Sequence, residues 1–223
     1  MIIQGIKGII AKIILKYCGE EKGREYINKQ FLSWARWNNK LLGLSIDIKG
    51  KENIPKGVCV FISNHQSILD IPIMVEASNR PIGFIAKKEL IKIPVLGQWM
   101  KLVHCVTLDR QNVREAIKVI NDGVENLKKG YSMGIFPEGT RAKDGIIKPF
   151  KKGSLKLATK AKVPIVPVTI DGAYKAFEID GKFKKANITI TFSKPIFTEN
   201  LSREEEIELP KIIENTIRTN LKK

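Results

Sequence analysis

The sequence predicts an α/β fold with a mixed, mostly parallel central sheet flanked by helices. From about residue 44 onward, short apolar runs alternate with stretches of helical periodicity, which is typical of α/β domains. Runs such as VCVFI and VPIVPVTI are apolar on both faces, as parallel strands covered by helices on both sides must be. Residues 1–43 lack this alternation, and we expect them to form two amphipathic helices ahead of a domain at 44–223.

The first predicted helix is amphipathic with a basic rim. At about 100° per residue, its apolar side chains share one side: Ile2, Ile6, Ile9, Ile10, Ile13 and Tyr17. Gln4, Lys12 and Lys16 fall on the other side. A membrane-spanning helix needs about 20 mostly apolar residues, and Lys7, Lys12 and Lys16 interrupt the apolar stretches here. No small-residue cleavage site follows, as a secretory signal would require, so we expect neither a membrane-spanning helix nor a secretory signal.

The second predicted helix spans about residues 25–42. Its apolar and aromatic stripe recurs at spacings of three and four: Phe31, Trp34, Trp37, Asn38, Leu41 and Leu42. Trp34 and Trp37 favour a membrane interface, because tryptophan is enriched at the level of lipid headgroups. Two interpretations stay open. Both helices could pack on the core, as most amphipathic helices do, or residues 1–43 could be a membrane-associating element whose lysines contact lipid.

Within residues 44–223, we predict strands from short apolar runs and helices from a period of 3.6 residues. The predicted strands are 44–49, 58–63, 82–86, 105–108, 133–136, 165–170 and 188–192. The predicted helices are 71–77, 112–129, 151–161 and 203–221. No internal repeat, low-complexity segment or long Gly/Ser linker divides this part of the sequence further.

Composition limits the class of protein. With 43% hydrophobic and 28% charged residues, the 223 residues are neither a disordered tract nor a collagen-like repeat, and about 70 to 75% of the unfolded surface can be buried. The three cysteines are odd in number and include no CxxC pair. They therefore predict neither a disulfide framework nor a metal site, and they fit a reducing compartment.

Catalytic chemistry is predicted directly after the second strand, where sites in open α/β sheets tend to lie. His65 is one of only two histidines, and Asp70 follows five residues later. Histidine is the usual general base near neutral pH, and a carboxylate can fix its tautomer. This pair lacks a nucleophile, which would then come from a substrate. The alternatives are an Asp70 that only caps the helix containing Pro72 and a His65 that is only a loop donor.

Basic residues follow the ends of other predicted strands. The segment 136–141, FPEGTR, must turn sharply because Pro137 and Gly139 flank its glutamate. Arg141 is then presented at the strand's end, where its planar guanidinium suits a phosphate or carboxylate. Arg110 ends another strand segment, although it could simply pair with Asp109. With the strand-ending residues Lys87 and Lys88, these arginines would form an anion pocket.

Taken together, these segments resemble the 1-acyl-sn-glycerol-3-phosphate acyltransferases, which acylate lysophosphatidic acid at the glycerol 2-position. Residues 64–70, NHQSILD, are similar to the family's NHxSxxD motif, and FPEGTR is similar to its third motif. Residues 105–110 resemble the second motif and 163–168 the fourth, and the order and spacing agree over about residues 58–170. The second motif departs most, at His104 and near Thr107, which bears on the shape of the acceptor pocket.

The resemblance implies a glycerolipid acyltransferase-like fold and transfer of a fatty acyl group from an acyl thioester to the 2-hydroxyl of 1-acyl-glycerol 3-phosphate, which gives phosphatidic acid. His65 would be the base and Asp70 its orienter. By similarity, the acceptor phosphate would be held by Arg141, Arg110 and Lys87. The pocket would be shaped by Glu138, Gly139 and Thr140. Glu138 could instead brace a nearby arginine, and we assign His104 to the sheet with no catalytic part.

The resemblance further implies no cofactor and no metal, with acyl-CoA or acyl carrier protein as the donor substrate. We expect a peripheral, monotopic location on the cytoplasmic face of the cell membrane. Lys and Arg number 39 against 23 Asp and Glu, which gives a formal charge of +16. This excess suits an anionic membrane surface and anionic substrates. The basic patch at residues 141–162 contains only Phe150 as an aromatic residue, so we expect no nucleic acid partner.

Two rival functions stay open. One is acyl transfer to another acceptor, such as glycerol 3-phosphate or another lysolipid. The other is a non-enzymatic lipid-binding protein of the same fold, which could have lost His65 or Asp70; both are present.

Overall fold

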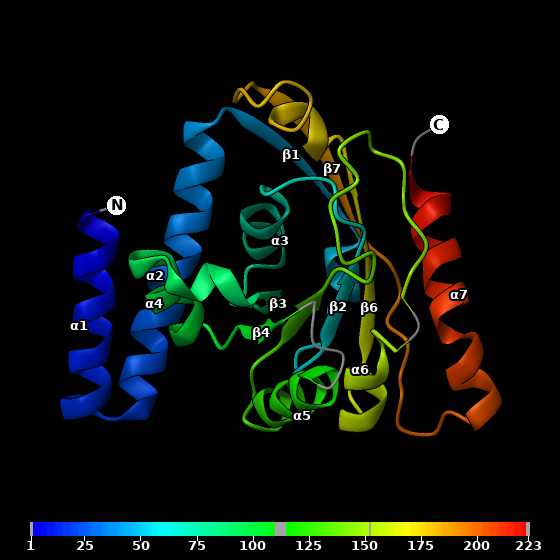
Figure 1. Cartoon of the computed structure of the whole chain (residues 1–223), viewed down its shortest axis with the longest axis horizontal. Helices are drawn as coiled ribbons and strands as arrows, with labels where there is room; N and C mark the ends of the chain where they lie inside the picture. The colour runs from blue at the N-terminus through cyan, green and yellow to red at the C-terminus, as the bar shows by residue number, and fades with distance from the viewer. Residues whose placement is uncertain (1, 110–114, 152, 222–223) are drawn as a thin grey trace.

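The computed structural model describes residues 2–109, 115–151 and 153–221 and places one sheet between helices on both of its faces (Figure 1). Within these residues the sheet has seven strands in the order β1-β7-β6-β2-β5-β3-β4. Their bounds are β1 Leu44–Lys49, β2 Val60–Ser63, β3 Gly83–Lys87, β4 Val106–Leu108, β5 Met133–Ile135, β6 Ile165–Asp171 and β7 Ala186–Phe192. β6 and β7 pair antiparallel, and the other neighbours pair parallel. The predicted fold class is confirmed.

Two hydrophobic clusters lie on opposite faces of the sheet, and β2 contributes to both. Phe61 belongs to a cluster with α2 (Glu20–Leu41) and α3 (Asp70–Ser78), whereas Val60 and Ile62 belong to a second cluster. The helices of the second cluster are α5 (Glu115–Lys128), α6 (Lys156–Ala161) and α7 (Arg203–Asn220). Because side chains alternate across a strand, a strand buried on both faces needs apolar residues at successive positions, as Val60, Phe61 and Ile62 of β2 are.

The helix α1 (Ile2–Cys18) packs through small residues and leaves its isoleucines exposed. Gly8 and Ala11 are its buried residues, and Trp99 of α4 (Pro94–Leu102) donates a hydrogen bond of 2.9 Å from Nε1 to the Gln4 carbonyl. The predicted apolar side is 38 to 80% exposed. That side does not pack on the core, so the core-packing interpretation is wrong for it. In the described part of the chain, no helix is long and apolar enough to cross a bilayer.

Only part of the apolar and aromatic stripe predicted for α2 is buried. The helix begins at Glu20, earlier than expected, and its buried residues are Gly23, Ile27, Phe31, Ala35 and Asn39. Trp34 stacks on Phe31 with ring centroids 5.4 Å apart, whereas Trp37 is 59% exposed. The contact with α3 selects this face, because Asn39 donates from Nδ2 to the Pro72 carbonyl at 3.0 Å.

The strands other than β1 differ from their predicted ranges by one or two residues at their ends, and the larger differences concern helices. α4 was not predicted, since its nine residues include Gly97; Pro94 occupies its first turn, where proline is tolerated. α6 begins at Lys156 and not at 151, because Gly153 has a φ of +90°, which a helix cannot contain. The predicted start of the fifth helix at 112 lies outside the described residues. β1 has the predicted bounds.

Candidate active site

The structure brings His65 and Asp70 into contact. His65 lies in the loop after β2, and Asp70 is the first residue of α3. His65 Nδ1 is 2.7 Å from Asp70 Oδ2, and this oxygen also accepts from the backbone N–H groups of Gln66 (2.7 Å) and Ser67 (2.9 Å). Because those two contacts identify Oδ2 as an acceptor, Nδ1 carries the hydrogen and Nε2 keeps its lone pair. The ring is therefore arranged to accept a proton at Nε2.

The Asp70 carboxyl is fully buried. Burial raises its pKa, whereas the hydrogen bonds from His65, Ser67 and Gln66 lower it and favour the carboxylate. Oδ1 is buried and finds no hydrogen-bond partner among the described residues. The carboxylate binds N–H groups that precede α3 and not those of its first turn. The interpretation of Asp70 as only an N-cap is therefore wrong.

The exits of neighbouring strands fix the loop that contains His65. Its backbone N–H donates to Glu138 Oε1 at 2.7 Å, and its carbonyl accepts from Ala142 N at 2.7 Å. Asn64 bridges to β6 through both main-chain groups of Ile170, at 2.8 and 2.9 Å. The imidazole also stacks on Phe136, with centroids 4.0 Å apart and planes at 16°. The ring is thus held from both its backbone and its face.

Of the three residues predicted to shape the pocket, Glu138 has the clearest structural role. It is 3% exposed and accepts from the N–H groups of His65 and Lys148 (2.9 Å). Burial raises its pKa, and those two N–H groups oppose the shift. These donors are backbone groups and not an arginine, so Glu138 braces the backbone of two segments and not the arginine suggested by the sequence. Gly139 has a φ of +68°, and a Cβ there would lie 2.7 Å from the Lys151 Nζ. Thr140 is exposed.

Arg141 pairs with a residue that the sequence did not indicate. Its Nη1 donates to Glu178 Oε1 at 2.8 Å, and the Glu178 side chain is 2% exposed. The same carboxylate oxygen accepts from Ile68 N at 3.1 Å. Glu178 follows β6 and lies 37 positions after Arg141 in the sequence. No local pattern marks it, because only the sheet order brings the exits of β5 and β6 together around β2.

The remaining basic residues do not all form the anion pocket that the sequence predicted. Lys87 is exposed at the end of β3, opposite Leu108 of β4 in the sheet register. Lys88 is paired with Glu115, its Nζ 3.0 Å from Oε1, so it does not face the site as a free cation. Arg110 lies outside the described residues. Lys87 thus ends β3, and Arg141 follows the neighbouring strand β5.

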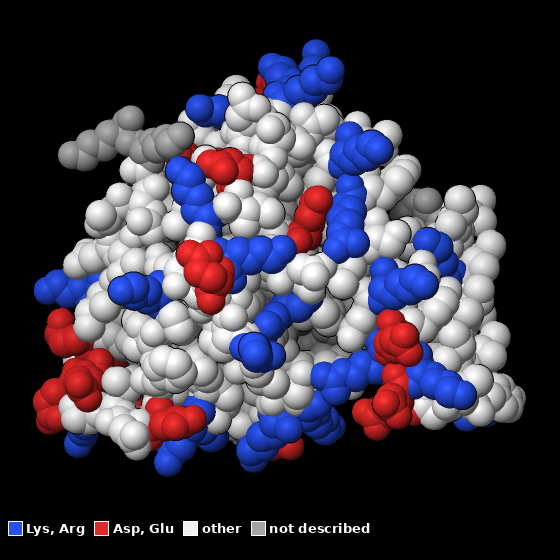
Figure 2. Space-filling model, turned by 180° about the vertical axis from the view of Figure 1, so that it is seen from behind, with Lys and Arg blue, Asp and Glu red and all other residues white. Residues whose placement is uncertain are grey.

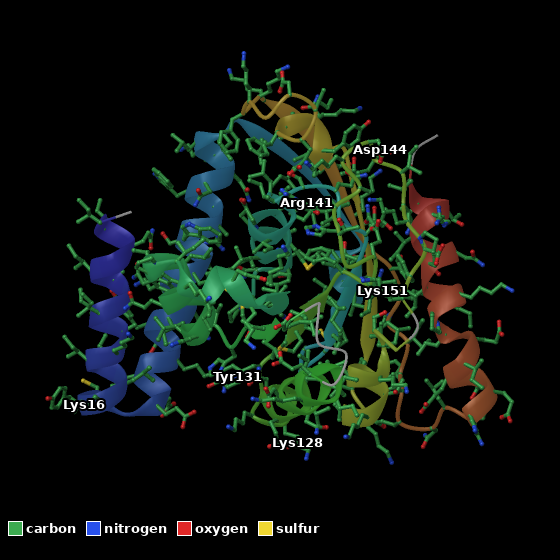
Figure 3. All side chains as sticks on the ribbon, in the orientation of Figure 1. Lys16, Lys128, Tyr131, Arg141, Asp144 and Lys151 are labelled. Carbon is green, nitrogen blue, oxygen red and sulfur yellow. The ribbon has the colours of Figure 1, made fainter. Side chains whose placement is uncertain are left out.

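The basic excess is spread across the rear face of the molecule. Figure 2 shows Lys and Arg over much of this face, with smaller groups of Asp and Glu between them and at its lower left. In Figure 3, Arg141 and Asp144 lie toward the upper end of the molecule, and Tyr131 and Lys128 lie toward the lower end. At the amino ends of β3 and β5, His104 stacks on Tyr131 with centroids 3.5 Å apart. It precedes β4 with a φ of +58°, so its assignment to the sheet is wrong.

We find no cluster of metal ligands in the described part of the chain. No three His, Cys, Asp or Glu side chains there gather as a metal site would require. Two hydroxyls flank His65 in the sequence, but Ser63 Oγ donates to the Asn64 carbonyl and Ser67 Oγ donates to Glu178. The arrangement can therefore act as a general base on a bound hydroxyl group.

Comparison with known proteins identifies the class. A family model described as Acyltransferase matches residues 45–171, more than half of the sequence, and the chain belongs to this acyltransferase family. The 1-acyl-sn-glycerol-3-phosphate acyltransferase of Saccharomyces cerevisiae is 35% identical over 205 residues, which are 90% of this chain and 67% of the relative. A chloroplast protein of the same name from Brassica napus is 39% identical over 155 residues, 68% of this chain and 45% of the relative. The predicted resemblance to these acyltransferases is confirmed.

A solved structure agrees with these relatives. The 1-acyl-sn-glycerophosphate acyltransferase PlsC of Thermotoga maritima superimposes with a TM-score of 0.79 at 28% identity. The match covers 98% of this chain and 93% of that protein. A probable 1-acyl-sn-glycerol-3-phosphate acyltransferase of Mycoplasma pneumoniae is 35% identical over 174 residues, 72% of this chain and 65% of the relative. The chain thus spans 45 to 67% of the lengths of the three curated relatives named here.

Proposed function

We propose that this chain transfers a fatty acyl group from an acyl thioester to the 2-hydroxyl of 1-acyl-glycerol 3-phosphate and so forms phosphatidic acid. One observation carries the proposal. A histidine with a 2.7 Å contact to a buried aspartate lies at the exit of β2, and Arg141 follows the adjacent strand β5. The names of the relatives agree with this acceptor.

The reaction needs one proton carrier and two bound substrates. His65 Nε2 accepts the proton of the acceptor hydroxyl as its oxygen attacks the thioester carbonyl. Asp70 accepts from Nδ1 and stabilises the imidazolium that forms. When the tetrahedral intermediate collapses, the carbon–sulfur bond breaks and the leaving sulfur takes the proton from Nε2. General-base assistance of this kind contributes about 10² to 10⁴ in rate.

The nucleophile in this proposal is the substrate hydroxyl, so no acyl-enzyme forms. The hydroxyls of Ser63 and Ser67 donate to the Asn64 carbonyl and to Glu178, and not to His65. Holding the acceptor by its phosphate then becomes the main means of bringing the hydroxyl to Nε2. Arg141 and Lys87 are the described residues proposed for that contact, and Arg110 is a third candidate from the sequence.

The donor is proposed to be acyl-CoA or acyl carrier protein, with no other cofactor. Both carry phosphate or acidic groups, which a chain of formal charge +16 would attract. The proposed location is peripheral, on the cytoplasmic face of an anionic membrane, and the exposed isoleucine side of α1 and the exposed Trp37 support the contact with a membrane surface. There the acceptor could enter the site directly from the lipid.

The test is a panel of acceptors incubated with the purified protein and labelled acyl-CoA or acyl carrier protein. Lysophosphatidate should give labelled phosphatidate, and glycerol 3-phosphate or a lysolipid without a terminal phosphate should give far less product. His65→Ala should abolish transfer while circular dichroism shows a folded protein. Retention of more than about a tenth of wild-type turnover would exclude the assigned base, since such a base contributes ~10² or more.

A second variant separates acceptor binding from chemistry. Arg141→Ala removes a charge-assisted contact made in both ground and transition states, so it should raise the acceptor KM and lower kcat/KM. The donor KM should change less. An effect on the donor KM alone would assign Arg141 to coenzyme A.

A further inference from the structure

Glu178 connects the two halves of the candidate site. Its Oε1 accepts from Arg141 Nη1 at 2.8 Å, from Ile68 N at 3.1 Å and from Ser67 Oγ at 3.4 Å. Ser67 and Ile68 belong to the loop between His65 and Asp70, and Arg141 belongs to the segment after β5. One carboxylate oxygen therefore fixes the guanidinium relative to the loop of the catalytic base.

The Glu178 side chain is itself immobilised. It is 2% exposed, and its own backbone N–H donates to the Tyr174 carbonyl at 2.9 Å. Its contacts with Ile68 and Ser67 do not involve Arg141, so the carboxylate would keep its place if the guanidinium moved. Burying a carboxylate to this degree costs desolvation free energy, which its hydrogen bonds and its ion pair must compensate.

Most N–H donors of the Arg141 guanidinium have no hydrogen bond to the described residues. Arginine carries five N–H donors in a planar fork, and within the described residues its guanidinium has one recorded hydrogen bond, to Glu178. The side chain is 32% exposed, in contrast to its partner. Nη1 of Arg141 is thus held by Glu178, and the remaining N–H donors belong to a partly exposed side chain that an incoming anion can reach.

We propose that Glu178 is a positioning residue that holds Arg141 for the phosphate of the acceptor and so sets the distance between that phosphate and His65. This inference rests on the proposed function and deepens it. The phosphate binds the outer donors of Arg141 and does not displace Glu178, because Glu178 has its own anchors. Glu178 acts as a fixed hydrogen-bond acceptor, so an uncharged acceptor of the same shape can replace it.

The experiment compares Glu178→Ala with Glu178→Gln on whichever phosphorylated acceptor the wild type acylates best. Glu178→Ala should raise the acceptor KM about tenfold, the scale of one charge-assisted hydrogen bond, and leave the donor KM within about twofold. Glu178→Gln keeps the accepting oxygen and should restore the acceptor KM to within about threefold of wild type. If Glu178→Ala does not fold, Glu178→Asp, which shortens the reach by one methylene, takes its place with the same expectation.

Two controls separate positioning from general support of the fold. In an Arg141→Ala background, Glu178→Ala should raise the acceptor KM no further, whereas a scaffold residue would cost the same in both backgrounds. Glu214 offers a matched pair away from the site, since it binds Arg218 at 2.7 Å and Phe150 N at 3.1 Å. Glu214→Ala should leave the acceptor KM unchanged.

Several results would overturn the inference. They are an unchanged or lowered acceptor KM in Glu178→Ala, an equal rise in the donor KM, a failure of Gln to restore the acceptor KM, and additive effects with Arg141→Ala. A wild-type protein that acylates no phosphorylated acceptor would overturn both this inference and the proposed function. If the wild type is active and Glu178→Ala leaves the acceptor KM unchanged, this inference alone is overturned.

Discussion

Replacing Asp70 by Asn should separate catalysis from folding. An Asn side chain can keep its oxygen where Oδ2 now accepts from His65, Gln66 and Ser67, but it removes the negative charge. The imidazolium forms only during the reaction, so that charge acts on the transition state and kcat is affected more than the acceptor KM. Unit charges about 4 Å apart at an effective dielectric of about 20 interact by about 4 kcal/mol. At about 1.36 kcal/mol per factor of ten, kcat should fall about 10³-fold.

The stability of Asp70→Asn should change much less than its activity. The new NH₂ would occupy the place of Oδ1, which is buried and unpartnered among the described residues, and an unsatisfied buried donor costs about 1 to 3 kcal/mol. Removing a buried charge offsets this cost, since burial is the main cause that raises the Asp70 pKa. The checks are thermal unfolding and the release of free thiol or carrier with lysophosphatidate as acceptor. A variant that unfolds near wild-type temperature and keeps more than about a tenth of wild-type kcat would refute the electrostatic role.

Three further expectations concern other parts of the chain. Glu138→Gln leaves one backbone N–H facing an amide NH₂, so the folded state should lose about 1 to 3 kcal/mol of stability and kcat should fall about tenfold. Because burial raises the Glu138 pKa, folded wild type binds a proton more readily than the unfolded chain, and the melting temperature of wild type relative to the variant should rise as pH falls through that pKa. Burial raises the pKa of Cys59 and Cys105 to about 11, so Ellman's reagent at pH 8 should titrate the exposed Cys18 alone, with reaction at the other two increasing as pH rises. Replacing three isoleucines of α1 by asparagine should release the protein from liposomes at any salt concentration. Replacing its three lysines by glutamine should weaken binding mainly to anionic liposomes at low ionic strength. Sedimentation with vesicles measures both effects, and an isoleucine variant that still binds neutral liposomes would contradict the expectation. The substituted residues are Ile6, Ile10 and Ile13, and Lys7, Lys12 and Lys16.

Local patterns were sufficient for the approximate position of most strands and for the segment that brings His65 and Asp70 into contact. β1 was predicted to the residue, because an alternating run bounded by Gly43 and Gly50 has clear ends. The five-residue spacing suggested that His65 and Asp70 could meet, since a loop that turns into a helix brings such residues together, and the resemblance of residues 64–70 to the NHxSxxD motif gave the pair its predicted role. The same reasoning failed for α4, whose short sequence contains Gly97, and for the buried face of α2, which the contact with α3 selects.

The sequence by itself determined the chemistry that this chain can offer: an α/β sheet with a histidine and an aspartate after its second strand and an arginine after its fifth. These features are local, because each depends on residues within a few positions of one another. Only the tertiary structure decided which groups hold those residues. Glu138 supports the His65 backbone across 73 positions, and Glu178 reaches Arg141 across 37. The physical reason is the strand order, which places β5 and β6 on either side of β2 and so makes neighbours of segments that no spacing in the chain relates.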